Sequence, residues 1–202
     1  MIIIGITGNL ASGKSETARL FKKHGAVVFD ADAAAKRAVK KGTPVYKAIV
    51  KIFGEEYLRP NKDLDRKKLA RRVFSRPKDL KTLNTLIHPG VIFEVFNVIH
   101  RLKGRKGVLA LDVPLLFESR MESLADFTLV VRSTRKRMLE RAGKKGLSGP
   151  LARKILSTQW PIAKKARLAD FVIDNNGTPA DLEKKVLEVL EKVQSAGRPT
   201  GG

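Results

Sequence analysis

Eight residues close to the N-terminus have the types and the spacing that bind a nucleotide phosphate. In order they are Gly8, Asn9, Leu10, Ala11, Ser12, Gly13, Lys14 and Ser15, which match the pattern G-x-x-x-x-G-K-S. In such a P-loop the backbone N–H groups surround a phosphate, aided by the positive end of the following helix dipole. The lysine reaches the β- and γ-phosphates, and the serine hydroxyl ligates Mg²⁺. Lys14 is therefore a candidate catalytic residue, and Ser15 is a candidate metal ligand.

The chain on both sides of this loop meets the structural condition of the motif. Residues 2–6 are apolar and predict a buried strand, and residues 16–23 predict a helix with an apolar side. A strand, a glycine loop and a helix in succession are the structural context in which this pattern binds phosphate. The alternative is a chance glycine turn that caps a helix, and the flanking elements favour phosphate binding over it. Gly8 and Gly13 then mark positions where a Cβ would obstruct the backbone or its approach to phosphate.

Two carboxylates follow a second apolar run, residues 26–29. Asp30 and Asp32 stand at its end, and α/β sheets bind their ligands beyond the carboxyl ends of their strands. If the strand continued, the two side chains would point to opposite sides of the sheet and would have different roles. Helix N-capping is the alternative, because residues 33–39 are expected to be helical. We expect at most one of the two aspartates to be only a cap.

A third apolar run, residues 108–111, also ends in a carboxylate, Asp112. In P-loop proteins a strand that closes on aspartate places an acidic group beside Mg²⁺ or its water shell. Asp112 is therefore a second candidate metal ligand. The leucines and the phenylalanine that follow it, Leu115 among them, are expected to pack in the core.

The stretch between the second and third expected strands is helical in character. Apolar residues recur there with helical spacing, and no strand is expected over about residues 42–104. Helices are expected over residues 45–53, 64–74 and 80–87. His88 and Pro89 are expected to open a further long amphipathic helix, since proline suits the first helical turn. We expect this insert to hold a substrate. His88 is a candidate contact to that substrate, with capping or packing as the alternative.

Basic residues are frequent after the fourth expected strand, residues 126–131. Arg137 and Arg141 are four apart and share one helix face, which suits phosphate binding, with a solvated basic surface as the alternative. Helices and a flexible basic loop make residues 135–166 a predicted lid. The rest of the chain predicts a fifth strand over residues 171–174, an amphipathic helix over residues 182–193 and a disordered tail over residues 195–202.

These elements predict an α/β fold with a five-stranded parallel sheet, doubly wound by helices. The expected single domain covers residues 1–194. Its P-loop core takes in about residues 1–41, 105–134 and 167–194. The helical insert and the lid complete the domain.

Composition narrows the class of protein. The chain has 202 residues, no cysteine and a net charge of +21, from 41 Lys and Arg against 20 Asp and Glu. The basic residues are spread along the chain, and aromatic residues make up 6% of it. Because no signature of a nucleic-acid-binding module is present, a generally basic surface is favoured over a specific nucleic-acid site. The N-terminal apolar run is too short for a signal peptide or a membrane span. We expect a soluble, cytoplasmic and monomeric protein without a membrane partner.

Over about residues 2–193 the chain resembles one family, the dephospho-coenzyme A kinases. Many families share the P-loop, whereas three further segments in this order are more specific. They are Asp30-Ala31-Asp32, Val113-Pro114-Leu115-Leu116-Phe117-Glu118 and Ile173-Asp174-Asn175-Asn176-Gly177. His88-Pro89, the Arg137 and Arg141 pair and Gln159 also match the family.

The chain departs from the family pattern at a few positions. Asn9 and Ala11 replace glycines and stiffen the P-loop slightly. Glu16 replaces a threonine and brings a carboxylate near the α-phosphate region, with an effect that the sequence leaves open. Ala142 replaces a frequent acidic residue in the lid.

The resemblance implies ATP-dependent phosphorylation of the ribose 3′-hydroxyl of dephospho-coenzyme A, the last step of coenzyme A synthesis. It implies ATP and Mg²⁺ as cofactors and Asp32 as the base near the attacking hydroxyl. The other residues carried over are Arg141 in catalysis, residues 8–16 with Arg137 and Arg141 in ATP binding, and Asp32, His88 and Leu115 in substrate binding. Two alternatives stay open: another P-loop nucleoside or nucleotide kinase, and a nucleic-acid-associated P-loop ATPase.

Overall fold

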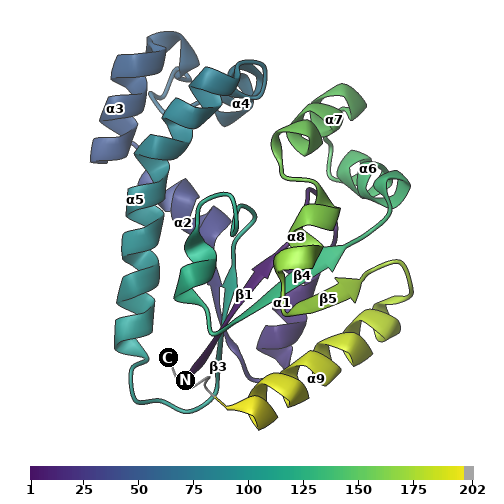
Figure 1. The fold of residues 1–202 in the computed structure, drawn as a ribbon. Coiled ribbons are helices and arrows are strands. Elements are labelled where there is room, and N and C mark those ends of the chain that lie inside the picture. Colours follow the sequence, from purple (N-terminus) through teal and green to yellow (C-terminus); the bar gives the residue numbers. More distant parts are fainter. Residues whose placement is uncertain (198–202) are drawn as a thin grey trace. The chain divides into compact units, whose positions relative to one another are not determined.

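A computed structural model of the protein describes residues 1–197. Five parallel strands form one sheet in the order β2-β3-β1-β4-β5. The strands are β1 (Ile2–Thr7), β2 (Val27–Asp30), β3 (Val108–Asp112), β4 (Phe127–Arg132) and β5 (Phe171–Asp174). The central strand is β1, between β3 and β4 (Figure 1). The predicted α/β fold with a five-stranded parallel sheet is confirmed.

Two long helices cover one face of this sheet. Helices α1 (Lys14–Lys23) and α9 (Pro179–Ala196) lie side by side in Figure 1. Phe21 of α1 and Val186 of α9 are fully buried and belong to one apolar cluster with Ile4 and Ile6 of β1. Burial of this apolar area is the main driving force for folding of this part of the chain.

The opposite face of the sheet is covered by shorter elements. Because side chains alternate along a strand, Gly5 faces away from the α1 side. A Cβ at Gly5 would lie 2.9 Å from a methyl carbon of Leu116, so the loop after β3 packs closely there. The 3-10 helix η2 (Met121–Leu124) contacts β1, and α8 (Ile162–Leu168) contacts β4. The sheet is therefore wound on both faces, as predicted.

Two further helices stand between β4 and α8. Thr134 is the N-cap of helix α6 (Arg135–Lys144), and its hydroxyl accepts a hydrogen bond from the backbone N–H of Arg137. Helix α7 (Gly149–Thr158) packs against α6. These helices occupy the segment that the sequence predicted as a lid.

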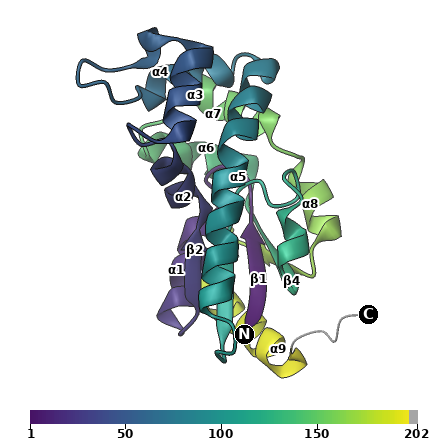
Figure 2. The ribbon, with the colours of Figure 1, turned by 90° about the vertical axis from the view of Figure 1, so that its left-hand side faces the viewer.

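The chain divides into two compact units. The first, the sheet unit, consists of Met1–Asp30 and the chain from Val98 onward, and the second, the helical unit, is Ala31–Asn97. The helical unit contains α2 (Ala31–Ala38), α3 (Pro44–Phe53), the 3-10 helix η1 (Glu55–Tyr57), α4 (Arg66–Val73) and most of α5 (Pro77–Arg101). Figure 2 shows α3 and α4 beside the N-terminal part of α5.

A separate apolar core holds the helical unit together. Its buried members are Ile49, Phe53, Leu64, Leu69 and Val73. The N-termini of two of its helices are capped, because the Thr43 hydroxyl accepts the N–H of Tyr46 and the Asp65 carboxylate accepts the N–H of Lys68. The prediction of helices without strands in this part of the chain is thus confirmed. The two helix caps are local interactions that stabilise these helices.

The main correction to the sequence analysis concerns α5. The sequence predicted two helices with His88 and Pro89 at the start of the second, whereas one helix runs through both residues. An internal proline removes one backbone hydrogen bond of the helix. Apolar packing on both sides of it maintains the helix, since Leu86 packs on the helical core and Val91 is buried.

Other predicted boundaries also shift. Helix α2 begins at Ala31 and not at residue 33, directly after β2. The helical unit accordingly begins at Ala31 and ends at Asn97, whereas the predicted insert ran from residue 42 to residue 104. Helix α9 continues through Ala196, so the first residues of the predicted tail are helical. Residues 198–202 of that tail lie outside the described residues.

Within residues 1–197, one helix is long and apolar enough to cross a membrane by length and composition, namely α5. This is weak support for a span, because helices of soluble proteins meet the same criterion. The absence of a membrane partner stays a prediction.

Candidate active site

The P-loop connects β1 directly to α1. Strand β1 ends at Thr7, and helix α1 begins at Lys14. Gly13 precedes the helix with φ of 106°, and Ala11 has φ of 57°, so the loop enters the left-handed region twice. A Cβ at Gly8 would lie 2.5 Å from the Val131 carbonyl oxygen, and one at Gly13 would overlap the Asn175 amide. Both glycines are therefore required by close packing, as the sequence predicted.

Lys14 and Asp112 form a buried ion pair. Lys14 is 8% exposed and Asp112 is 5% exposed, and the Lys14 ammonium donates to the Asp112 carboxylate. The parallel register that aligns Ile6 with Asp112 brings the carboxylate to the end of the strand that carries the P-loop. The predicted metal ligand and the predicted phosphate-binding lysine thus lie together at the carboxyl ends of the neighbouring strands β1 and β3.

Arg141 also reaches the P-loop. Its guanidinium donates to the carbonyl oxygens of Ser12 and Asn175, both at 3.2 Å. The Asn175 side-chain amide donates to the same Ser12 carbonyl at 2.9 Å. Helix α6 and the turn after β5 therefore hold the P-loop backbone from one side.

Arg137 lies apart from this contact. Its guanidinium donates to the Gly177 carbonyl at 3.4 Å, and the residue is exposed. Of the two arginines on one face of α6, only Arg141 contacts the P-loop directly.

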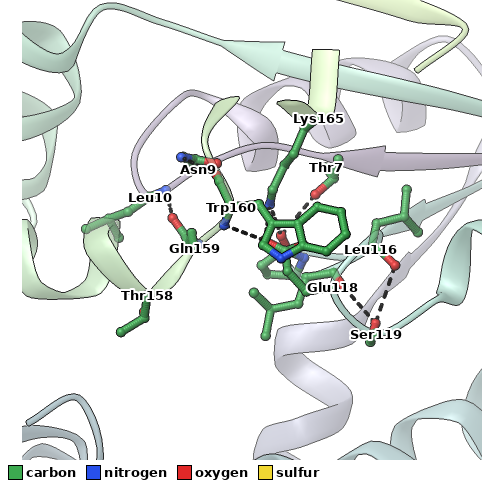
Figure 3. Close-up of polar contacts among 12 residues, drawn as sticks. Thr7, Asn9, Leu10, Leu116, Glu118, Ser119, Thr158, Gln159, Trp160 and Lys165 are labelled. Atoms are coloured by element: carbon green, nitrogen blue, oxygen red, sulfur yellow. Dashed lines mark hydrogen bonds and ion pairs between the residues drawn. The ribbon is translucent and has the colours of Figure 1, made fainter. Parts of the chain in front are cut away.

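The segment between α7 and α8 also contacts the P-loop, as Figure 3 shows for Gln159 and Trp160. The Leu10 N–H donates to the Gln159 side-chain oxygen at 2.9 Å, and the Asn9 amide donates to the Trp160 carbonyl at 3.3 Å. The Trp160 N–H donates to Glu118 at 3.0 Å. Three chain segments that are distant in sequence meet at this point.

Three other predicted residues of the sheet unit have different surroundings. Ser15 is exposed at the first turn of α1. Glu16 forms an ion pair with Arg19, whose hydrogen bond lowers the pKa of the Glu16 carboxyl. Leu115 is half-buried, and its carbonyl accepts the N–H of Ser119.

Two predicted substrate residues belong to the helical unit. Asp32 is exposed in the first turn of α2 and follows the end of β2 by two residues. His88 lies in the middle of α5 and is half-buried, and this burial lowers the pKa of its imidazole. Burial disfavours the charged imidazolium, so His88 is neutral near pH 7.

Comparison with known proteins decides the family. The sequence model of the family described as dephospho-CoA kinase matches residues 2–181. This chain belongs to the dephospho-CoA kinase family. A dephospho-CoA kinase of Anaeromyxobacter dehalogenans (strain 2CP-C) is 42% identical over 192 residues, covering 94% of this chain and 91% of that protein. One of Oryza sativa subsp. japonica is 40% identical over 196 residues, covering 96% and 85%.

Solved structures agree with this family assignment. The dephospho-CoA kinase from Campylobacter jejuni matches with a TM-score of 0.69 and 25% identity over 96% of this chain and 98% of that chain. A shikimate kinase from Acinetobacter baumannii shares the fold with a TM-score of 0.54 and 16% identity over 95% and 94%. The P-loop kinase fold predicted from the sequence is therefore confirmed.

Two oxygen donors of the site, from Ser15 and Asp112, would suit a magnesium ion. The Ser15 hydroxyl and the Asp112 carboxylate supply hard oxygen atoms, which Mg²⁺ prefers. Within residues 1–197, no group of three or more His, Cys, Asp or Glu side chains could hold a metal.

Sequence reasoning assigned no role to several residues of this dephospho-CoA kinase site. Glu118 and Gln159 appear in the sequence only as matches to the family, Lys165 only as one of the dispersed basic residues, and Trp160 carries no prediction. Lys165 is fully buried. Among 41 Lys and Arg residues, the sequence carries no signal that separates one buried lysine from the exposed ones. The presence of a single tryptophan was the one available hint.

Proposed function

We propose that this protein transfers the γ-phosphoryl group of ATP to the ribose 3′-hydroxyl of dephospho-coenzyme A, giving coenzyme A and ADP. The match to the dephospho-CoA kinase family over nearly the whole chain carries this proposal. The intact P-loop, with Lys14 and Asp112 at one sheet edge, supports it.

Phosphoryl transfer depends mainly on positioning and on charge neutralisation. In the proposed reaction the P-loop N–H groups bind the phosphates, and Lys14 neutralises charge on the β- and γ-phosphates. The 3′-oxygen forms a bond to the γ-phosphorus, and the bond from this phosphorus to the β–γ bridging oxygen breaks. The bond electrons leave with ADP.

Asp32 is the proposed base. It accepts the proton of the 3′-hydroxyl, or orients that hydroxyl, as the 3′-oxygen attacks the γ-phosphorus of ATP. Its exposure at the start of α2 leaves the carboxylate accessible to a ligand. His88 and Leu115 are the other proposed substrate contacts.

Mg²⁺ is the proposed metal, and Ser15 and Asp112 would hold it. When bound, it neutralises phosphate charge and orients the transferring group. Arg141 contributes a further positive charge from α6, and Arg137 and Glu16 are proposed to lie near the nucleotide. The lid helices keep water away from the γ-phosphoryl group.

An acceptor screen tests the proposal. Purified protein with ATP and Mg²⁺ is given dephospho-coenzyme A, AMP or shikimate in parallel, and ADP formation is measured. We expect turnover with dephospho-coenzyme A far above the other two acceptors. Preference for AMP or shikimate would instead support another small-molecule P-loop kinase.

We also propose that the protein is a cytoplasmic monomer without a specific nucleic-acid partner. Its charge of +21 is spread over many basic residues, so binding of RNA or DNA should be weak and should disappear as salt rises to physiological levels. Tight, sequence-selective binding at physiological salt would support a nucleic-acid-associated ATPase instead.

A further inference from the structure

Lys165 of α8 is a charged residue with no exposed surface. Its ammonium forms an ion pair with Glu118 at 2.8 Å and donates to the Pro114 carbonyl at 3.1 Å. Burial lowers the pKa of Lys165, and the hydrogen bond to Glu118 opposes this shift. A buried ion pair is weak support for stability, because apolar side chains of similar volume often serve equally well.

Glu118 joins Lys165 to the segment between α7 and α8. The Glu118 carboxylate oxygen that pairs with Lys165 also accepts the backbone N–H of Trp160. The Pro114 carbonyl is shared in the same way, since it accepts both Lys165 and the Thr7 hydroxyl at the end of β1. Figure 3 shows Thr7, Glu118, Trp160 and Lys165 together beside the P-loop residues Asn9 and Leu10.

The residues held by Glu118 contact the P-loop itself. Gln159 accepts the Leu10 N–H, and the Trp160 carbonyl accepts the Asn9 amide. These bonds act on a backbone that is strained, since Ala11 is a non-glycine residue with positive φ. Such a conformation persists only where its surroundings hold it.

We propose that Lys165 is a positioning residue for the nucleotide site. By fixing Glu118 and the Pro114 carbonyl, it holds Gln159 and Trp160 against the P-loop and keeps the loop in the conformation that receives phosphate. This proposal rests on the proposed function only in that the P-loop binds ATP. It does not depend on the identity of the acceptor.

Trp160 provides a direct probe of this arrangement. It is the single tryptophan of the chain, and the Lys164 ammonium lies 3.6 Å from the centre of its ring. Its fluorescence emission therefore reports the surroundings of this one segment. A change in position that exposes the ring to water would move the emission to longer wavelength.

The experiment uses the full chain with paired substitutions. Lys165→Met combined with Glu118→Gln removes both charges, so that no buried charge is left without a partner, and the new amide oxygen can still accept the Trp160 N–H. Gln159→Ala removes the contact to Leu10 alone. Lys192→Met, an exposed position on α9, is the matched control.

Three quantities are measured for each variant: the thermal midpoint, the Trp160 emission without ligand, and the dissociation constant for ATP by calorimetry. We expect the double variant, where folded, to show a red-shifted emission and an ATP dissociation constant raised by about 2- to 10-fold, the range for one lost hydrogen bond. Gln159→Ala should raise the constant similarly with little change in the midpoint, and Lys192→Met should change none of the three.

A purely structural role gives a different result. If the folded double variant has a lower midpoint but wild-type emission and wild-type ATP affinity, the proposal is overturned. If the double variant does not fold, the ATP dissociation constant of Gln159→Ala tests the proposal. A wild-type dissociation constant in that variant contradicts it. Because dephospho-coenzyme A is absent from these measurements, failure of the proposed function in the acceptor screen is a separate outcome.

Discussion

The sheet unit and the helical unit handle their charges differently. The sheet unit contains two buried ion pairs. Lys14 of the P-loop pairs with Asp112, and Lys165 pairs with Glu118. In the described helical unit no ion pair is buried to this degree: Arg37 with Glu94 and Lys62 with Glu55 lie at the surface. Arg72 with Asp79 is half-buried. Buried pairs are sensitive to the loss of either partner, whereas exposed pairs contribute little. The comparison indicates that buried ion pairs hold the P-loop region of the sheet unit, whereas the described helical unit has no fully buried pair and relies on its apolar core.

The largest effect is expected at Lys14. Lys14→Met should lower turnover by about 10³-fold or more, because the phosphoryl group loses its neutralising cation. It also leaves Asp112 buried without its cation, which should lower the free energy of unfolding by about 3–5 kcal/mol. Turnover and urea unfolding are measured, with Lys22→Met, an exposed lysine on the same helix, as the control.

The double variant Lys14→Met with Asp112→Asn separates these two effects. It should regain most of the lost stability without regaining turnover. Near-normal turnover in either variant, with folding verified by circular dichroism, would contradict the role of Lys14.

The next effect concerns the proposed base. Asp32→Asn should lower turnover by about 10²–10⁴-fold with nearly unchanged ATP affinity, since a positioned base contributes about that much and the amide is close in size. Asp32 is exposed, so its replacement should leave stability unchanged. Asp112→Asn should instead raise the Mg²⁺ concentration needed for half-maximal turnover. Full turnover in Asp32→Asn would leave Asp32 only an acidic residue of the first turn of α2.

A core substitution measures how much apolar packing contributes to the stability of the helical unit. Leu69 is 5% exposed within the apolar core of that unit. Leu69→Ala should lower the free energy of unfolding by about 2–5 kcal/mol, from lost transfer energy and the cavity left behind. Chemical unfolding measures this, and a loss below about 1 kcal/mol would mean that the core is loosely packed.

An exposed ion pair within the sheet unit offers a test through pH. The Arg132 guanidinium holds the pKa of the Asp174 carboxyl below its ordinary value, through hydrogen bonds of 2.7 and 2.8 Å. A depressed carboxyl pKa stabilises the fold above the ordinary value of about 3.9 and loses this effect as pH falls through the folded-state pKa. Thermal midpoints of wild type and Asp174→Asn should therefore differ slightly at pH 6 and converge once the pH falls below the lowered pKa of Asp174. A difference that persists in acid would exclude this ion pair as its cause.

The smallest effect is expected at the surface of the helical unit. Glu94→Gln removes the partner of Arg37, and both side chains are at least one-third exposed. The free energy of unfolding should change by about 0–1 kcal/mol. A loss as large as that of Lys14→Met would remove the contrast between the two units.

Local pattern was sufficient for much of this protein. The P-loop, the three strands that end in Asp30, Asp112 and Asp174, and the helical character of the insert could all be predicted. Each depends on hydrophobic period, on glycine spacing or on a carboxylate next in sequence to an apolar run, and these are short-range properties. The carboxyl ends of parallel strands meet at one edge, so the general place of the site also followed.

Long-range packing decided what local pattern could not. Pro89 predicts a helix start by its type, yet packing on both sides keeps it inside α5. Arg137 and Arg141 are equivalent by spacing, and only the position of α6 brings Arg141 to the Ser12 carbonyl. The family resemblance supplied Gln159 without a role, and the structure joined it to Leu10.

The sequence by itself determined which residues could bind phosphate and in which order the strands and helices form. The tertiary structure alone decided that Lys14 lies against Asp112, 98 residues away, and that Lys165 is buried beside Glu118. The physical reason is that a charged side chain has the same local propensity whether it is solvated or buried. Burial and partner are set by the register of the strands and by the packing of α8 on the sheet, which involve residues far apart in the chain.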